Sequence, residues 1–165
     1  MVGADDLFAE VQTRLDWYRG RRLMYGTWYD EPRMSARHKM SDAVVPNVIP
    51  AAARTLSVKY GRRFSGLFCN YYQTGQDSVA WHADRIGRTK VDPLVAIISL
   101  GGPRVFAMRD QRRSKDKALG ASTLRWEMRS GDLLVMGGAT QHHWEHSIPK
   151  VKAAPPRISL TTRAG

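Results

Sequence analysis

From residue 66 onward the chain is a succession of short apolar or alternating segments, separated by glycine and other turn-forming residues. Such segments are typical of β-strands, and no long helical period interrupts them. We expect strands at 67–72, 78–84, 94–100, 104–109, 124–128, 133–136 and 157–163, the first two joined as a hairpin by the turn at 73–77. Many short strands after a helical segment predict a mainly β (α+β) fold, a double-stranded β-helix or jelly roll with two N-terminal covering helices.

The first 65 residues have a different pattern. Apolar side chains recur at spacings of four, four and three over residues 4–19, which predicts a helix that ends before Gly20 (Leu7, Val11, Leu15, Tyr18). A second helix is expected at about 50–60, with Pro50 in its first turn and Gly61 after its end. Residues 21–45 have no clean period and predict irregular or short-strand structure. We expect one domain, residues 1–165, with the helical cover in 1–65 and the jelly-roll core in 66–165.

The unusual property of the composition is charge. The 165 residues include 26 Lys and Arg against 15 Asp and Glu, a formal net charge of +11, whereas the apolar fraction of 42% is ordinary. A domain this basic is expected to meet a polyanion, with nucleic acid as the first candidate, although a generically basic surface would give the same count. The single Cys69 excludes an internal disulfide and fits a reducing, cytoplasmic setting. No apolar run resembles a signal peptide or is long enough to span a membrane.

Two stretches have residues that suit nucleic acid. Residues 21–45 interleave arginines with aromatic side chains such as Trp28, an arrangement typical of base stacking with phosphate contact. The same aromatic residues could instead seal a small core. Residues 110–121 are expected to form an exposed loop with a basic run that contains Arg112 and Arg113. That loop is either an edge that attracts anions or a solvated loop without a partner.

The chemistry of the chain begins at His82 and Asp84. A His-x-Asp pair on an extended strand places both side chains on one face. With His146 the pair supplies two imidazoles and one carboxylate, the facial triad that holds Fe(II) in non-haem oxygenases and leaves positions open for a co-substrate and O₂. Chance His-x-Asp pairs are common, and His142 or His143 could compete for the metal. Zinc is disfavoured because no cysteine is near.

Two further expected strands have polar side chains on one face. Asn70 and Tyr72 share a face of 67–72, and the last strand alternates apolar residues with a polar set (Arg157, Ser159, Thr161, Arg163). An arginine directed toward a core needs an anion, and a guanidinium is suited to bidentate pairing with a carboxylate. A small dicarboxylate beside iron would satisfy both arginines. Alternatively, Arg163 points to solvent and Arg157 forms an ordinary salt bridge.

These residues are part of a longer set of motifs. They are NYY at 70–72, DSVAWHAD at 77–84, SLG at 99–101, RVF at 104–106, GDLLVMGG at 131–138, WEH at 144–146, PK at 149–150 and RISLTTR at 157–163. With them the chain resembles the AlkB family of Fe(II)/2-oxoglutarate dioxygenases, which remove alkyl groups from nucleic-acid bases. The segment EPRM at 31–34 is similar to the family's substrate lid. The match covers more than half of the chain in the order of the family.

The resemblance implies roles for individual residues. His82, Asp84 and His146 would bind iron, because the family's aromatic-x-His pattern selects His146 over its two histidine neighbours. Arg157 would pair with the distal carboxylate of 2-oxoglutarate, and Arg163 would lie near its other end. The remaining contacts to this co-substrate would come from three side chains (Asn70, Tyr72, Ser159).

The resemblance also implies a reaction. It is the oxidative demethylation of N1-methyladenine and N3-methylcytosine, in DNA first and RNA second, with formaldehyde, succinate and CO₂ as products. A base treated in this way must leave the stack or be single-stranded.

The chain departs from the family where the base is read. Arg85 and Ile86 follow the His-x-Asp motif, where many members have acidic residues, and the lid has Arg37 and His38 where aromatic residues are usual. Arg85 could contact phosphate or be an ordinary surface residue. Contacts to the substrate are therefore expected from a mixed set (Trp28, Arg33, His38, Arg85, Arg112, Arg113). The N-terminal part is short for the family, which suggests a truncation.

Three hypotheses follow. The first is a cytoplasmic, monomeric demethylase of alkylated nucleic acid without a membrane partner. The second is an oxygenase of the same chemistry that acts on a protein or a small molecule, which the changes at Arg85 and Ile86 allow. The third is a non-catalytic nucleic-acid-binding module that retains the fold, against which the intact triad argues. Stimulation of 2-oxoglutarate turnover by methylated oligonucleotides separates the first from the second.

Overall fold

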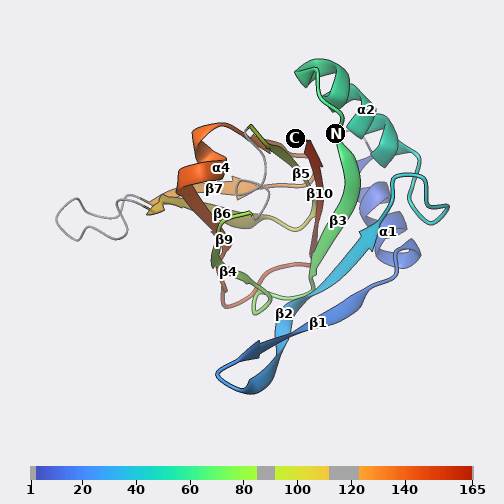
Figure 1. Ribbon diagram of the computed structural model, residues 1–165. Coiled ribbons are helices and arrows are strands. Elements are labelled where there is room, and N and C mark those ends of the chain that lie inside the picture. Colours follow the sequence, from blue (N-terminus) through green and yellow to red (C-terminus); the bar gives the residue numbers. More distant parts are fainter. Residues whose placement is uncertain (1–2, 85–91, 112–122, 165) are drawn as a thin grey trace.

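Two antiparallel sheets face each other in the computed structural model, which describes residues 3–84, 92–111 and 123–164 (Figure 1). The larger sheet has the strand order β1 (Tyr18–Met24), β2 (Thr27–His38), β3 (Ser65–Tyr72), β10 (Arg157–Ala164), β5 (Leu94–Gly101) and β8 (Leu133–Met136). The smaller sheet has the order β4 (Val79–His82), β9 (Trp144–Ile148), β6 (Arg104–Asp110) and β7 (Thr123–Met128). This is the mainly β, jelly-roll architecture expected from the sequence.

Three helices complete the described part of the chain. Helices α1 (Ala4–Arg14) and α2 (Val48–Tyr60) cover the outer face of the larger sheet, and the short α4 (Ala139–His143) leads into β9 (Figure 1). Gly61 follows α2 in the left-handed conformation, with φ of 62°, and its N–H donates to Ser57 and Val58 carbonyls. The second predicted helix and its glycine stop are therefore confirmed. None of the helices in the described residues has the length and apolar character needed to cross a membrane.

Strand β10 lies inside the larger sheet, and its alternation separates the core from the site. Ser159 pairs with Asn70 of β3 on one side and with Ser99 of β5 on the other. Ile158 and Leu160 are buried in the apolar cluster that includes side chains of α1. Because neighbouring side chains of a strand point to opposite faces, this burial directs the polar set of β10 into the space between the two sheets. A second apolar cluster fills part of that space (Tyr72, Val95, Ile97, Phe106, Met108, Met128, Met136, Ile148).

The first predicted helix is too long. Helix α1 ends at Arg14, since Leu15 already has extended backbone angles (φ −82°, ψ 148°), and Tyr18 begins β1. Gly20, predicted to follow the helix, lies inside β1, where an added Cβ would stand 2.9 Å from the Glu31 carboxylate. The glycine therefore leaves room for the Glu31 side chain where the β1–β2 pairing is irregular, between Arg19 and Arg21, and it does not mark a helix end.

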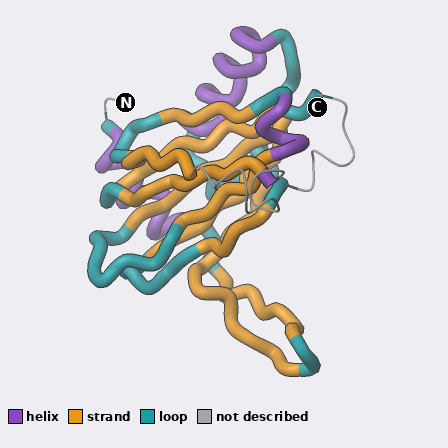
Figure 2. Tube along the Cα trace, turned by 90° about the vertical axis from the view of Figure 1, so that its left-hand side faces the viewer, coloured by secondary structure: helices purple, strands orange, loops and turns teal. Residues whose placement is uncertain are grey.

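Residues 21–45 are more regular than expected. They contain most of the β1–β2 hairpin, which projects beyond the body of the molecule (Figure 2). Tyr25 and Gly26 form its tip with φ angles of 51° and 79°. Two consecutive positive φ angles match the turns that fit the twist of a two-residue hairpin. The sequence shows no alternation of apolar and polar residues here, because most of β1 and the first part of β2 are exposed on both faces.

The predicted hairpin over 67–84 is wrong. Strand β3 pairs with β2 and β10 in the larger sheet, whereas β4 pairs with β9 in the smaller one. The turn at 73–77 thus connects the two sheets, and a turn sequence does not distinguish this connection from a hairpin. Strand β4 also ends at His82, so Asp84 lies in the segment that follows it. Strand β9 and helix α4 were not predicted.

Candidate active site

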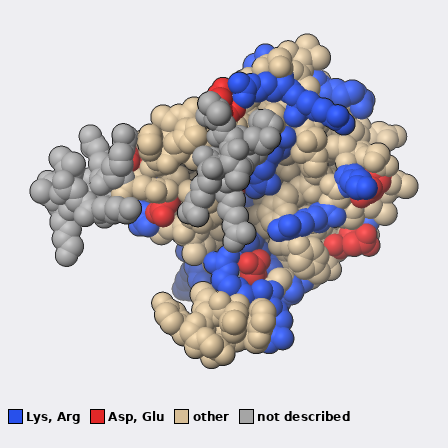
Figure 3. Space-filling view, in the orientation of Figure 1, with Lys and Arg blue, Asp and Glu red and all other residues tan. Residues whose placement is uncertain are grey.

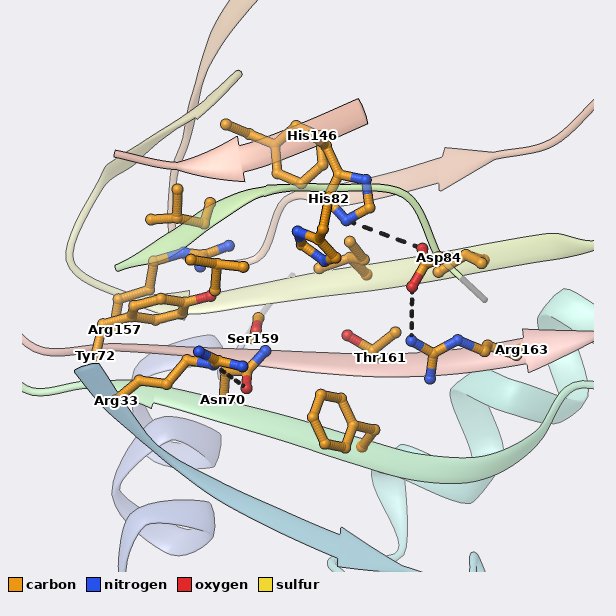
Figure 4. Close-up of a pocket in the computed structure, with 16 residues that line it drawn as sticks. Arg33, Asn70, Tyr72, His82, Asp84, His146, Arg157, Ser159, Thr161 and Arg163 are labelled. Carbon is orange, nitrogen blue, oxygen red and sulfur yellow. Dashed lines mark hydrogen bonds and ion pairs between the residues drawn. The ribbon is translucent and has the colours of Figure 1, made fainter. Parts of the chain in front are cut away.

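Three potential metal ligands converge at one edge of the smaller sheet. His82 ends β4 and pairs directly with His146 of β9, and Asp84 lies two residues beyond β4 (Figure 4). One ligand atom from each lies within 4.8 Å of the others, and His146 Nε2 is 3.9 Å from Asp84 Oδ2. Two imidazoles and one carboxylate at this spacing can hold one metal ion. This donor set suits Fe(II) with open coordination positions.

Hydrogen bonding and stacking orient both imidazoles. His82 Nδ1 lies 2.9 Å from the Ala80 carbonyl oxygen, which can only accept, so this nitrogen bears the proton and Nε2 presents its lone pair. The His146 ring stacks on Phe106, with centroids 5.3 Å apart and planes 15° from parallel. Burial, and next the neighbouring His82, lower the pKa of His146 to about 4. His146 is therefore neutral at neutral pH, as a metal ligand must be.

The Arg157 guanidinium lies in the same cavity, and only its Nε has a hydrogen-bond partner among the described residues. Its side chain is 1% exposed, and its Nε donates to Ser99 Oγ at 2.8 Å. Within the described residues, Nη1 and Nη2 have no hydrogen-bond partner, and burial lowers the pKa of the guanidinium. A buried charge without a partner is costly, and two parallel N–H groups match a carboxylate. The group therefore fits an anionic co-substrate, in a cavity of about 80 Å³ that the three metal ligands also line.

Strand β2 supplies one wall of this cavity. Arg33 Nε donates to Asn70 Oδ1 at 2.9 Å, and Ser35 Oγ lies 3.3 Å from the same oxygen. The Arg33 guanidinium also forms an ion pair with Glu31 at 3.2 Å. The Asn70 oxygen is thus occupied, which leaves the amide NH₂ group as its donor for a ligand. The segment expected to form a lid is fixed to the wall of the cavity by these contacts.

Arg163 contacts the metal site directly. Its Nη2 donates to Asp84 Oδ1 at 3.0 Å, while Asp84 Oδ2 faces His146 (Figure 4). The Asp84 side chain is 9% exposed and that of Arg163 is 34% exposed. A carboxylate held by one oxygen keeps the other oriented toward the imidazoles. Arg163 therefore positions Asp84, a contact that the sequence did not predict.

Comparison with known protein families agrees with the metal-binding geometry of His82, Asp84 and His146. Residues 8–163 match the 2OG-Fe(II) oxygenase superfamily. The chain belongs to this superfamily. Membership implies Fe(II), 2-oxoglutarate and O₂, which the triad and the free guanidinium donors of Arg157 fit.

Curated relatives of this chain confirm the resemblance to the AlkB family. The chain is 29% identical to alpha-ketoglutarate-dependent dioxygenase alkB homolog 3 of Bos taurus, over 97% of the chain and 61% of the relative. It is 27% identical to DNA oxidative demethylase ALKBH2 of Bos taurus, over 97% of the chain and 64% of the relative. The chain thus spans somewhat less than two thirds of the length of these relatives.

A solved structure supports the fold. It is an oxidoreductase of the 2OG-Fe(II) oxygenase family from Burkholderia pseudomallei, with a TM-score of 0.63, 15% sequence identity and coverage of 95% of this chain and 76% of that one. At this identity the similarity shows the fold alone.

The structure places the expected co-substrate residues of the oxygenase together and separates the expected substrate residues. Asn70, Tyr72, Arg157, Ser159 and Arg163 all line the first cavity. Among the substrate residues, Arg33 lines that cavity, His38 lines a second cavity beside it, and Trp28 is on the projecting hairpin, 56% exposed. The remaining three predicted residues lie outside the described part of the chain (Arg85, Arg112, Arg113).

Four contributors to the site were missed from sequence. Phe68 and Phe106 line the first cavity, and Ser99 holds Arg157. Phe68 could have been found, since it shares the alternation of Asn70 and Tyr72. Arg104 is 3% exposed and donates to the carbonyl oxygens of three residues at 2.7–3.1 Å (Thr74, Asp77, Pro149). It thereby fixes the loops at the Arg157 end of the cavity, a role that no local pattern indicates.

Proposed function

We propose that this oxygenase removes alkyl groups from N-alkylated bases in DNA, and secondarily in RNA. The proposal depends on one observation. The buried Arg157 guanidinium, whose Nη1 and Nη2 have no hydrogen-bond partner among the described residues, lies in one cavity with His82, Asp84 and His146. Such an arrangement suits a bound iron next to an anionic co-substrate. The names of the relatives, which include a DNA oxidative demethylase, indicate nucleic acid as the substrate class.

In this proposal the residues of the first cavity have distinct roles. His82, Asp84 and His146 hold iron, which with 2-oxoglutarate and O₂ supplies oxidation of an N-methyl carbon, with formaldehyde, succinate and CO₂ as products. Arg157 binds one carboxylate of 2-oxoglutarate. The neighbouring neutral groups donate hydrogen bonds and orient it (Asn70, Tyr72, Ser159). The apolar walls exclude water from the reacting carbon (Val95, Ile97, Phe106, Ile148).

The projecting hairpin is the proposed contact to the nucleic-acid strand. It exposes Trp28 and Tyr29, and its arginines lie beside them, with the Arg21 guanidinium 5.7 Å from the centre of the Trp28 ring. Aromatic faces stack on bases and arginines neutralise phosphates, which together suit an unpaired strand. The formal net charge of +11 supports this assignment. Arg112 and Arg113 are proposed as further phosphate contacts.

The organisation is proposed as follows. Residues 1–165 form one dioxygenase domain, with the cover and lid in 1–65 and the jelly-roll core in 66–165. Within the first part, β2 also extends the larger sheet. The domain acts as a cytoplasmic monomer.

The deciding experiment is demethylation of single-stranded DNA and RNA oligonucleotides that contain N1-methyladenine, with Fe(II), 2-oxoglutarate and ascorbate, measured by mass. Loss of one methyl group that requires both iron and 2-oxoglutarate would establish the function and rank the two polymers. Consumption of 2-oxoglutarate without loss of methyl from any alkylated oligonucleotide would direct the search to other substrates. No consumption would leave the non-catalytic binding module.

A further inference from the structure

A second cavity of about 280 Å³ adjoins the first at the Arg163 end. The two share Phe68, Thr161 and Arg163, so a ligand in the second cavity lies next to the metal ligand Asp84. Arg37 and His38, from the end of β2, form the outer wall. In Figure 3, Lys and Arg side chains border the hollow at the centre of this face. A base bound in the second cavity would therefore lie beside the three potential metal ligands of the first cavity.

The aromatic ring that lines the second cavity, Phe68, already contacts two arginine side chains. The guanidinium carbon of Arg37 lies 5.0 Å from the centre of the Phe68 ring, and that of Arg163 lies 5.8 Å from it. A ring face that attracts two guanidinium groups has little electrostatic attraction left for a third cation. Phe68 thus offers an apolar contact to a base without favouring a positively charged one.

Few carboxylates line the two cavities, and the nearby Glu31 and Asp42 are already paired with Arg33 at 3.2 Å and with His38 at 3.5 Å. Asp84 is the single acidic residue among the described residues that line them, and it is engaged by Arg163 at 3.0 Å and by the metal site. Four arginines line the same surfaces (Arg33, Arg37, Arg157, Arg163). Nothing in this set would offset the charge of a cationic base.

The charge of an alkylated base depends on the nitrogen that bears the alkyl group. N1 of adenine and N3 of cytosine have no proton, so methylation there gives a cation at neutral pH. N1 of guanine and N3 of thymine do have a proton, which the methyl group replaces, and the product is neutral. On one side of the methylated nitrogen, the neutral pair presents a carbonyl oxygen (O6 of guanine, O4 of thymine), which accepts hydrogen bonds from guanidinium groups, whereas the cationic pair presents an amino donor there (N6 of adenine, N4 of cytosine).

We infer that the cavity formed by Arg37, Phe68 and Arg163 selects neutral N-methyl bases, N3-methylthymine and N1-methylguanine, over the cationic N1-methyladenine and N3-methylcytosine. The inference rests on the proposed function and changes its order of substrates. Arg37 and Arg163 donate to the base carbonyl oxygens, Phe68 contacts the ring, and the methyl group points toward the iron ligands.

The test compares four single-stranded oligonucleotides of one sequence, each with one of these methylated bases, under identical Fe(II), 2-oxoglutarate and salt concentrations. We expect kcat/KM for the two neutral lesions to exceed that for the cationic ones by about tenfold or more, as an uncompensated like charge near a binding site implies. Equal values, or a preference for the cationic lesions, would overturn the inference and leave the proposed function intact. Failure to demethylate all four would overturn both.

A binding measurement separates base selection from phosphate contact. Under anaerobic conditions with Fe(II) and 2-oxoglutarate, no turnover occurs, and fluorescence anisotropy gives the affinity for each oligonucleotide and for its unmethylated form. Arg37→Gln is expected to reduce the preference for neutral lesions, and Arg37→Glu to reverse it. Arg125→Gln, an exposed residue on β7, is the control for loss of one charge and should leave the preference unchanged. If Arg37→Gln weakens all forms by one factor, Arg37 contacts phosphate and the inference is wrong.

Discussion

The two adjoining cavities differ in how the positive charge of their arginine side chains is stabilised. In the first, Arg157 lies 5.3 Å from the centre of the Tyr72 ring but is only 1% exposed, and its two terminal nitrogens have no hydrogen-bond partner among the described residues, so a bound anion is needed to balance its charge. In the second, Arg37 and Arg163 rest on Phe68 and remain in contact with solvent. Burial makes the first site selective for anions, since any ligand without a carboxylate leaves the charge of Arg157 unpaired. The second site tolerates a range of ligands and ranks them by charge.

The largest effect should come from the metal ligands of the first cavity. His82→Ala removes one imidazole at the end of β4 and is expected to lower turnover at least about a thousandfold, because the removed group is a proposed ligand of the metal. The far-ultraviolet circular dichroism spectrum should be unchanged, since the side chain is not part of an apolar cluster. Turnover near the wild-type value would contradict the assignment of the triad.

Replacement of Arg157 sharpens the contrast between the cavities. Arg157→Met should weaken 2-oxoglutarate binding about a hundredfold to a thousandfold, measured by calorimetry, because a buried charge partner is lost. The same variant should raise the unfolding temperature of the protein without co-substrate, since it removes an unpaired buried charge. Arg37→Met is the matched variant in the second cavity and should change neither quantity. A lower unfolding temperature for Arg157→Met would show that another group balances its charge.

Stability should depend on pH through His146. Its pKa is about 4 in the folded chain, against about 6.5 for an unperturbed histidine, so the unfolded chain takes up the proton first as pH falls. The metal-free protein should therefore lose up to about 3 kcal/mol of its unfolding free energy between pH 6.5 and 4. Urea unfolding at several pH values measures this slope. His146→Gln should lower the slope, and an unaltered slope would assign it to other groups.

The smallest effect is expected at the nucleic-acid contacts outside the cavities. Neutralising Arg21 and Arg22 on the hairpin, or Arg112 and Arg113, should weaken oligonucleotide binding several-fold and reduce the salt slope by about one or two. The control is neutralisation of Arg54 and Arg63, which lie on α2 and just after it. A double variant that leaves affinity and salt slope at wild-type values would remove that pair from the proposed contact surface.

Sequence predicted the parts of the molecule that have at least one buried face. Strands β5, β8 and β10 were found because their apolar residues are continuous or alternate, and the triad was found because its donor set is specific for one kind of chemistry. The hairpin was missed because its strands are exposed on both sides and lack a period. Pairing between β4 and β9 was missed because it joins residues 64 apart, His82 and His146, and no local signal encodes that register.

Substrate recognition was the least predictable part of the site. Sequence indicated that Arg37 and His38 differ from the family pattern but gave no position for them relative to the metal. The neighbouring positions of Arg37, Phe68 and Arg163 arise from three strands, β2, β3 and β10, which pair only in the folded sheet. Selectivity for a base therefore depends on long-range register and not on a motif.

The guanidinium of Arg104 connects segments of the chain that are far apart in sequence. Its hydrogen bonds to carbonyl oxygens close loops of 27, 30 and 45 residues. Closing loops of this length is what a disulfide does in secreted domains, where it restricts the unfolded chain. This chain has one cysteine, buried Cys69, and cannot form an internal disulfide. Arg104 thus acts as a cross-link without a redox state, and it reforms in a reducing solution whenever the chain refolds.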